Sequence, residues 1–159
     1  MSLRNRVLEA VSTGDLATVE ALVKDERRAV RHLVSLLYRP EEDLRRIGAR
    51  GIAVASRYHP KIVKEIIERI VWSMTNESNT YFPTGPEVLS AIADESPEML
   101  LPVAQDLIRL SSDTSLQEGL CDTLRRVAKR CPGQIAQGMT KTLNRRFEQG
   151  GCFGPRGRR

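Results

Sequence analysis

Three prolines recur along the chain at nearly constant spacing. Pro60, Pro97 and Pro132 are separated by 37 and 35 residues, and aliphatic residues occupy corresponding positions before and after each of them. Proline disfavours helical backbone in the residue before it and is well tolerated in the first turn of a helix. Each proline therefore predicts a sharp corner between two helices. Together the three corners predict a series of helical hairpins.

The composition favours an all-α chain. Aromatic residues make up 4% of the 159 residues, whereas hydrophobic residues make up 40%. Aliphatic side chains spread along the chain suit helix-on-helix packing better than the faces of a sheet, and the length suits one domain with one core. We predict a single domain over residues 1–148, with capping helices in 1–39, hairpins at 40–75, 86–112 and 114–148, and a flexible basic tail at 149–159.

A hairpin unit of about 35 to 40 residues resembles the repeats of HEAT and armadillo-like proteins. The resemblance covers roughly residues 40–148 and is carried by the proline corners and their aliphatic flanks. It implies a short α-solenoid, or α–α superhelix, in which the second helix of each hairpin lines a concave surface that binds partners. It implies no biochemical activity.

Residues 72–86 form the most irregular segment between two predicted helices, and they begin with the only tryptophan of the chain. At about 100° per residue Trp72 falls about 140° from Ile67, the centre of the core face of its helix, so we expect Trp72 to lie away from the core. Exposed aromatic residues beside polar groups are typical anchors of recognition. The predicted partner-binding residues are Trp72, Asn76, Glu77, Ser78 and Tyr81, with Glu65 and Glu68 on the preceding helix.

The aromatic side chains of this segment have an alternative role. If Trp72, Tyr81 and Phe82 fold back, they fill the space that a long loop leaves between hairpins. The segment also resembles a stretch of small bacterial and archaeal HEAT-like proteins, in which Trp is followed by Asn-Glu-Ser and later by a Pro-Glu pair that starts the next helix. Residues 76–78 and 86–87 match that pattern here.

Positive charge collects at the C-terminal end. Residues 123–159 hold ten Lys and Arg residues against one acid, a net +9, so the first 122 residues carry −4 and the whole chain +5. A basic surface can follow phosphates, which makes nucleic-acid binding the alternative function, whereas a solvated charged face is the simpler interpretation. The candidate polyanion-binding residues are Arg125, Arg126, Lys129, Arg130, Lys141, Arg145 and Arg146. A smaller stripe of Arg46, Arg50 and Arg57 is expected to be surface.

Catalytic chemistry has little support in the sequence. His32 and His59 lack a neighbouring nucleophile or metal-ligand motif, and Cys121, Cys131 and Cys152 include no CxxC pair. We expect no catalytic residue, metal or cofactor. Cys121 and Cys131 would lie on different sides of a helix, which favours reduced thiols. An enzyme remains a third option by fold analogy alone, because helical-repeat folds also occur in bilin lyases and alkylpurine DNA glycosylases.

No apolar run approaches the roughly 18 to 20 residues that a membrane span needs, and the first residues lack a signal-peptide pattern. We expect a soluble, cytoplasmic protein. The function predicted from the sequence is a non-enzymatic binding or scaffold module. It docks a protein partner on its concave second-helix face and through residues 72–86.

Overall fold

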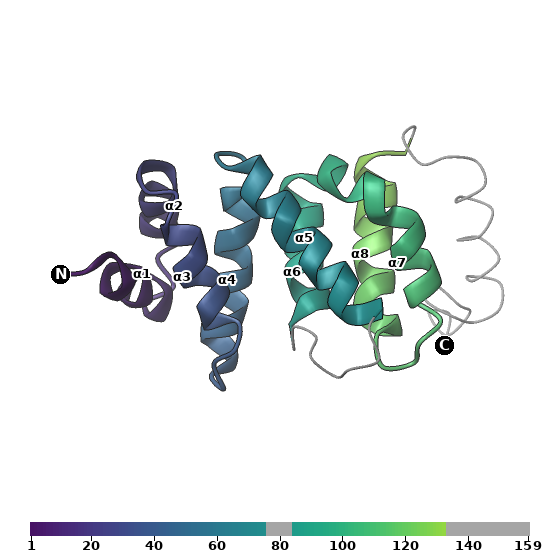
Figure 1. Ribbon diagram of the computed structural model, residues 1–159, viewed down its shortest axis with the longest axis horizontal. Coiled ribbons are helices and arrows are strands. Elements are labelled where there is room, and N and C mark those ends of the chain that lie inside the picture. The colour runs from purple at the N-terminus through teal and green to yellow at the C-terminus, as the bar shows by residue number, and fades with distance from the viewer. Residues whose placement is uncertain (76–83, 133–159) are drawn as a thin grey trace.

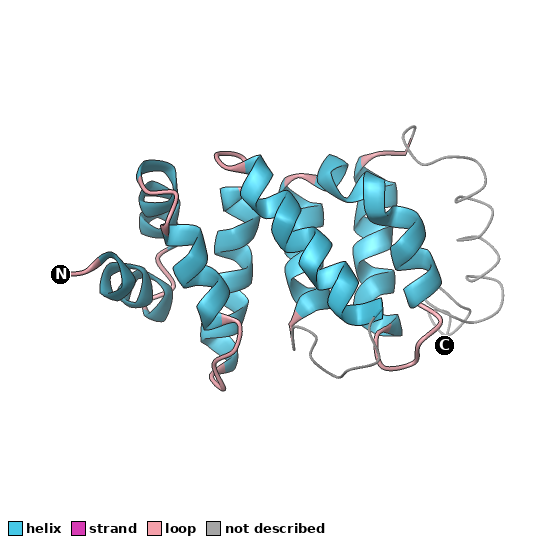
Figure 2. Cartoon of the chain, in the orientation of Figure 1, coloured by secondary structure: helices cyan, strands magenta, loops and turns pink. Residues whose placement is uncertain are grey.

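The computed structural model describes residues 1–75 and 84–132, and this part of the chain is helical and contains no strand (Figure 2). The all-α prediction is confirmed. Residues 133–159, which include the second helix of the last predicted hairpin and the basic tail, lie outside the described residues. The helices are α1 (Leu3–Ser12), α2 (Leu16–Asp25), α3 (Ala29–Leu36), α4 (Glu42–Ala55), α5 (Pro60–Thr75), α6 (Gly85–Glu95), the 3₁₀ helix η1 (Pro97–Val103), α7 (Ala104–Leu110) and α8 (Gln117–Arg130).

Several helix ends follow local sequence signals. Ser2 caps α1 by accepting a hydrogen bond from the Asn5 amide at 3.2 Å, and Asp15 caps α2 through the Thr18 amide at 3.1 Å. Such caps satisfy amide groups that have no partner inside the helix. Pro60 is the first residue of α5. The structure therefore begins a helix at the place where this proline predicts a corner.

The described helices form two layers (Figure 1). In one layer α4 packs against α6 and α6 against α8, and all three helices begin at the same end of the molecule. α5, η1 and α7 pack on one side of this layer. α2 and α3, which precede α4 in the chain, pack against α4. A continuous cluster of buried hydrophobic residues runs through the helices from α1 to α8.

Glycines allow two of these helix pairs to approach closely. A Cβ atom added to Gly119 of α8 would lie 2.5 Å from Cβ of Pro86 in α6, and one added to Gly51 of α4 would lie 3.0 Å from Leu33 Cδ2. Real Cβ atoms do not approach other atoms as closely as 2.5 Å. At Gly119 a larger side chain would therefore push the helices apart, whereas at Gly51 the neighbouring side chains of Leu33 and Val19 would have to shift by a few tenths of an ångström.

Two buried pairs of hydroxyls lie between neighbouring helices. Ser56 Oγ, at the end of α4, lies 2.6 Å from Ser96 Oγ, at the end of α6. Ser90 Oγ of α6 lies 2.7 Å from Thr123 Oγ1 of α8. All four residues are buried, and an unpaired buried hydroxyl is unfavourable. Each hydroxyl thus has its partner on the next helix of the layer.

The cysteines differ from the sequence expectation. Cys121, on α8 and 1% exposed, is disulfide-bonded. Cys131 is a free thiol. The expectation of reduced cysteines is therefore wrong for Cys121. The helix-geometry argument excluded only a bond between Cys121 and Cys131, and that bond is indeed not formed.

None of the helices within residues 1–75 and 84–132 combines the length and apolar character that a bilayer span requires.

Candidate binding surfaces

Trp72 lies on an exposed stripe of α5. Its side chain is 62% exposed, whereas Ile67 on the opposite side of the helix is 1% exposed. The prediction that Trp72 lies away from the core is confirmed, and the alternative in which it fills a gap between hairpins is wrong for this residue. Exposed residues at spacings of four, three and four share its side of the helix. We call them the Trp72 stripe: Lys61, Glu65, Glu68 and Trp72.

The stripe brings together Trp72, Glu65 and Glu68 of the predicted partner-binding set. The other predicted residues, Asn76, Glu77, Ser78 and Tyr81, lie outside the described residues, as does Phe82.

A hollow of about 1500 Å³ lies over the layer formed by α4, α6 and α8. Small residues are part of its lining, among them Ala49 and Ala53 of α4, Ser90 and Ala91 of α6, and Gly119 of α8. Their short side chains leave open the space between the longer, charged side chains around them. The residues that line it include none from α5 or α7. The hollow therefore belongs to the first helices of the predicted hairpins, whereas the prediction assigned partner binding to the second helices.

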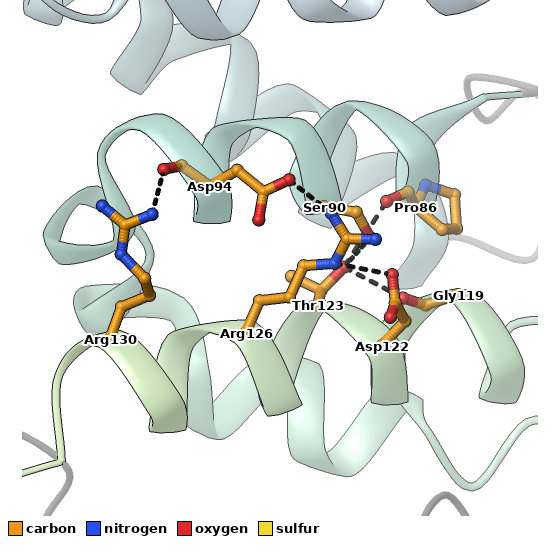
Figure 3. Close-up of polar contacts among 8 residues, drawn as sticks. All are labelled: Pro86, Ser90, Asp94, Gly119, Asp122, Thr123, Arg126 and Arg130. Carbon is orange, nitrogen blue, oxygen red and sulfur yellow. Dashed lines mark hydrogen bonds and ion pairs between the residues drawn. The ribbon is translucent and has the colours of Figure 1, made fainter.

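Arg126 and Arg130 of α8 are bound to α6 (Figure 3). Arg126 forms ion pairs with Asp94 of α6 and, at 3.0 Å, with Asp122 one turn away on its own helix. Arg130 Nη1 donates a hydrogen bond to the backbone carbonyl of Asp94 at 2.6 Å. Both guanidinium groups thus help to hold α8 against α6.

This arrangement divides the predicted polyanion-binding residues. Arg126 and Arg130 contact α6, whereas the side chains of Arg125 and Lys129 are exposed on α8. Lys141, Arg145 and Arg146 lie outside the described residues. Within residues 84–132 the basic end is therefore partly an internal contact between helices.

Arg57 connects three helical segments at the end of α4. Its guanidinium forms ion pairs with Glu20 of α2 at 3.3 Å and with Glu95 of α6 at 3.5 Å. Tyr58, the next residue, donates a hydrogen bond to Glu20 Oε1 at 2.5 Å. The following residue is His59, whose Nε2 lies 2.7 Å from the carbonyl oxygen of Val23. The turn before α5 is thus held to α2 by three consecutive residues.

The hydrogen bond between Tyr58 and Glu20 predicts that the Tyr58 hydroxyl titrates at a raised pKa. The hydrogen bond to Glu20 raises the pKa of the Tyr58 hydroxyl, so the bond contributes to stability below the unfolded tyrosine pKa of about 10 and is lost as the pH rises through the folded value. We expect Glu20→Gln to lower the pKa of Tyr58. The absorbance of tyrosinate, followed as the pH is raised, measures this pKa. The Tyr58→Phe variant assigns the signal. If Glu20→Gln still changes the tyrosinate titration when Tyr58 is replaced by Phe, the titration does not belong to Tyr58 and the assignment is wrong.

Three glutamates of the hollow were not identified by sequence reasoning. Glu42, Glu87 and Glu118 lie in the first turns of α4, α6 and α8. Partial burial raises the pKa of the Glu87 carboxyl; the charge of Arg45 lowers it and that of Glu42 raises it. The available signal was that each predicted first helix begins with an acid, a pattern that helix dipoles alone explain.

Neither metal ligation nor a known relative assigns a role to these surfaces. Among the described residues, no three His, Cys, Asp or Glu side chains come together as metal ligands. Comparison of the chain with protein-family models, with curated proteins and with solved structures gives no match. The two surfaces are therefore interpreted from their geometry and chemistry.

Proposed function

We propose that this chain is a non-enzymatic binding module, a short α-solenoid of the HEAT-like type, that docks a protein partner. The stacking of α4, α6 and α8 in one layer supports the architecture, as does the return of the chain through α5 and through η1 and α7 in the other. Folds of this kind expose long rows of helix faces to solvent. The partner surface we assign is the Trp72 stripe of α5.

The observation that carries the proposal is the exposure of Trp72. Tryptophan is among the residues most enriched at the centres of protein interfaces, because one side chain buries a large apolar area and loses little conformational entropy. In the described part of the chain, Met1 and Tyr38 are the other large hydrophobic residues that are exposed. Unlike Met1, Trp72 lies within a 16-residue helix with polar neighbours on its own stripe. That combination is typical of an interface anchor with a polar rim.

The two charged residues nearest to Trp72 on the stripe are acidic, which favours a protein over a nucleic acid. Glu68 and Glu65 lie one and two turns before Trp72 on the same stripe. Aromatic residues that stack on bases work together with cations that follow the phosphates. Two carboxylates beside the indole oppose a phosphate backbone, and they are compatible with a polar or basic protein surface.

Trp72→Ala is expected to weaken partner binding by about 2 kcal/mol or more, roughly 30-fold, because it removes the anchor of the interface. Its effect on the free energy of unfolding should stay within about 0.5 kcal/mol, since the side chain is mainly in solvent. Affinity purification with the unaltered chain identifies the partner, and titration with the purified partner measures the change.

The control is Lys64→Ala, which removes another exposed side chain of α5 about 80° around the helix from Trp72. It should leave the affinity unchanged. Trp72 is also the only tryptophan in the chain, so its fluorescence reports the contact directly. We expect quenching by acrylamide to fall when the partner binds. Undiminished affinity of the Trp72→Ala chain would remove the stripe as the docking surface.

A further inference from the structure

Three carboxylates form a row across one end of the hollow. Glu42, Glu87 and Glu118 belong to the first turns of α4, α6 and α8, which all begin at the same end of the molecule (Figure 1). Glu87 senses the charge of Glu42, and the first turn of α8 touches that of α6 where Gly119 meets Pro86. Packed helices lie about 8–10 Å apart. The acid row, as we call these three residues, therefore has one carboxylate about every 10 Å.

The acids of the row are not engaged elsewhere. None of the three carboxylates has an ion pair or a hydrogen bond within residues 1–75 and 84–132. An acid in the first turn of a helix interacts favourably with the helix dipole. That effect explains each residue separately. It does not explain why all three line the same hollow.

Thr84 provides an independent indication of a ligand. It lines the hollow immediately before α6 and is 8% exposed, and its Oγ1 atom is buried and has no hydrogen-bond partner in the described structure. Buried hydroxyls are nearly always paired. A donor group of a ligand in the hollow would satisfy the Thr84 oxygen, and peptide N–H groups and guanidinium groups are such donors.

Two of the five arginines that line the hollow are paired with carboxylates. Arg126 is paired with Asp94 and Asp122. Arg46 is paired with Asp43 at 2.9 Å.

Two further arginines of the wall differ in their contacts. Arg45 Nη1 donates to the carbonyl oxygens of Arg39 and Pro40, at 2.8 and 2.6 Å, and so turns toward the loop before α4. Arg50 is exposed and has neither a hydrogen bond nor an ion pair in the described part of the chain. Arg125 also lines the wall, on α8. Arg45 keeps its positive charge and lowers the pKa of Glu87, so the starts of the three helices hold three carboxylates against this one arginine that is unpaired in the described residues, and their charge is negative. Arg50 also opposes a cation.

We propose that the hollow binds a basic, extended segment of a protein partner, with the acid row receiving its Lys or Arg side chains. An extended chain advances about 3.3 Å per residue, so basic residues at every third position recur about every 10 Å. This spacing matches one carboxylate per helix. The small residues in the lining of the hollow leave room for the segment. The inference concerns the layer of first helices and does not depend on the Trp72 stripe.

A labelled peptide tests the proposal. The probe is a fluorescein-labelled peptide of four Arg-Ala-Ala repeats, and its binding to the full chain is measured by fluorescence anisotropy at low ionic strength. We expect binding to weaken about tenfold when the acid row is neutralised, because three exposed charge pairs are lost. That variant combines Glu42→Gln, Glu87→Gln and Glu118→Gln.

The matched control changes the net charge by the same amount outside the hollow. Its three substitutions remove exposed acids that have no ion pair in the described residues: Glu9→Gln, Asp25→Asn and Glu98→Gln. We expect it to bind the probe as the unaltered chain does. An equal loss in both variants would show that only net charge matters and would overturn the proposal. So would equal affinity for a peptide of four Glu-Ala-Ala repeats.

The substitution Arg50→Gln should change the affinity for the probe in the opposite direction. Removing this opposing cation should tighten binding of the basic probe about two- to fivefold, and a gain cannot come from partial unfolding. Unchanged or weaker binding of Arg50→Gln would count against the assigned surface. Because this probe reports on the hollow and the partner titration with Trp72→Ala reports on the stripe, the failure of one proposal is distinguishable from the failure of the other.

Discussion

Replacing Gly119 by alanine is expected to lower the free energy of unfolding by about 1–3 kcal/mol. The usual effect of this substitution inside a helix is a gain of about 0.5–1 kcal/mol, because alanine has the higher helix propensity. Here the added methyl would lie 2.5 Å from Cβ of Pro86. The proline ring is held by the first turn of α6 and cannot rotate away. The helices α6 and α8 must therefore separate.

Gly48→Ala is the matched control for this prediction. Gly48 also lies inside a helix, α4, and is buried, but an added Cβ would meet its nearest neighbours, Leu33 O and Leu36 Cβ, at an ordinary 3.5 Å. We expect this change to be neutral or stabilising. Urea unfolding followed by circular dichroism gives both values. If both substitutions shift stability in the same direction by the same amount, the contact between Gly119 and Pro86 is not as close as described.

Leu33→Ala is expected to cost about 2–5 kcal/mol, the range for removing a fully buried leucine. Leu33 of α3 is completely buried and packs over Gly51 of α4. Gly51→Ala alone should also destabilise the chain, since its Cβ would lie 3.0 and 3.1 Å from the two terminal methyl groups of Leu33. The two positions therefore compete for one volume.

The double variant Leu33→Ala, Gly51→Ala separates packing from other effects. Removing the Leu33 methyls makes room for the new Cβ, so the loss in the double variant should be smaller than the sum of the single losses by about 0.5 kcal/mol or more. Val19 Cγ1, also 3.0 Å from the added Cβ, keeps part of the strain. Strictly additive losses would mean that Leu33 and Gly51 do not share this contact.

The proline corners show what local sequence predicts well. Pro60 begins α5 and Pro97 begins η1, because proline restricts its own backbone and that of its predecessor wherever it occurs. The same rule explains why the second helix of the hairpin predicted at 86–112 is not continuous. Pro102 lies within η1, and the α-helix α7 begins only at Ala104. Proline lacks the amide hydrogen and crowds the preceding turn, so the second helix is divided.

The surfaces were harder to predict because they combine distant residues. The exposure of Trp72 follows from helix periodicity within α5 alone, and the sequence predicted it correctly. The ion pair of Arg126 with Asp122 follows from a spacing of four, but the pair with Asp94 depends on how α6 and α8 pack. The acid row requires three helix starts to lie side by side. No local pattern carries that information.

The two buried hydroxyl pairs determine how the first helices can move relative to one another. An aliphatic interface alone permits neighbouring helices to slide by a turn, about 5.4 Å, with modest loss of contact. Here a slide would separate Ser56 from Ser96, or Ser90 from Thr123. Ser56 and Thr123 would keep their bonds to carbonyls of their own helices, but the buried hydroxyls of Ser96 and Ser90 would lose their partners. The register of α4, α6 and α8 is thus set by buried polar groups between the helices. The positions of Glu42, Glu87 and Glu118 are consequently preorganised, and a partner need not supply the entropy of aligning them.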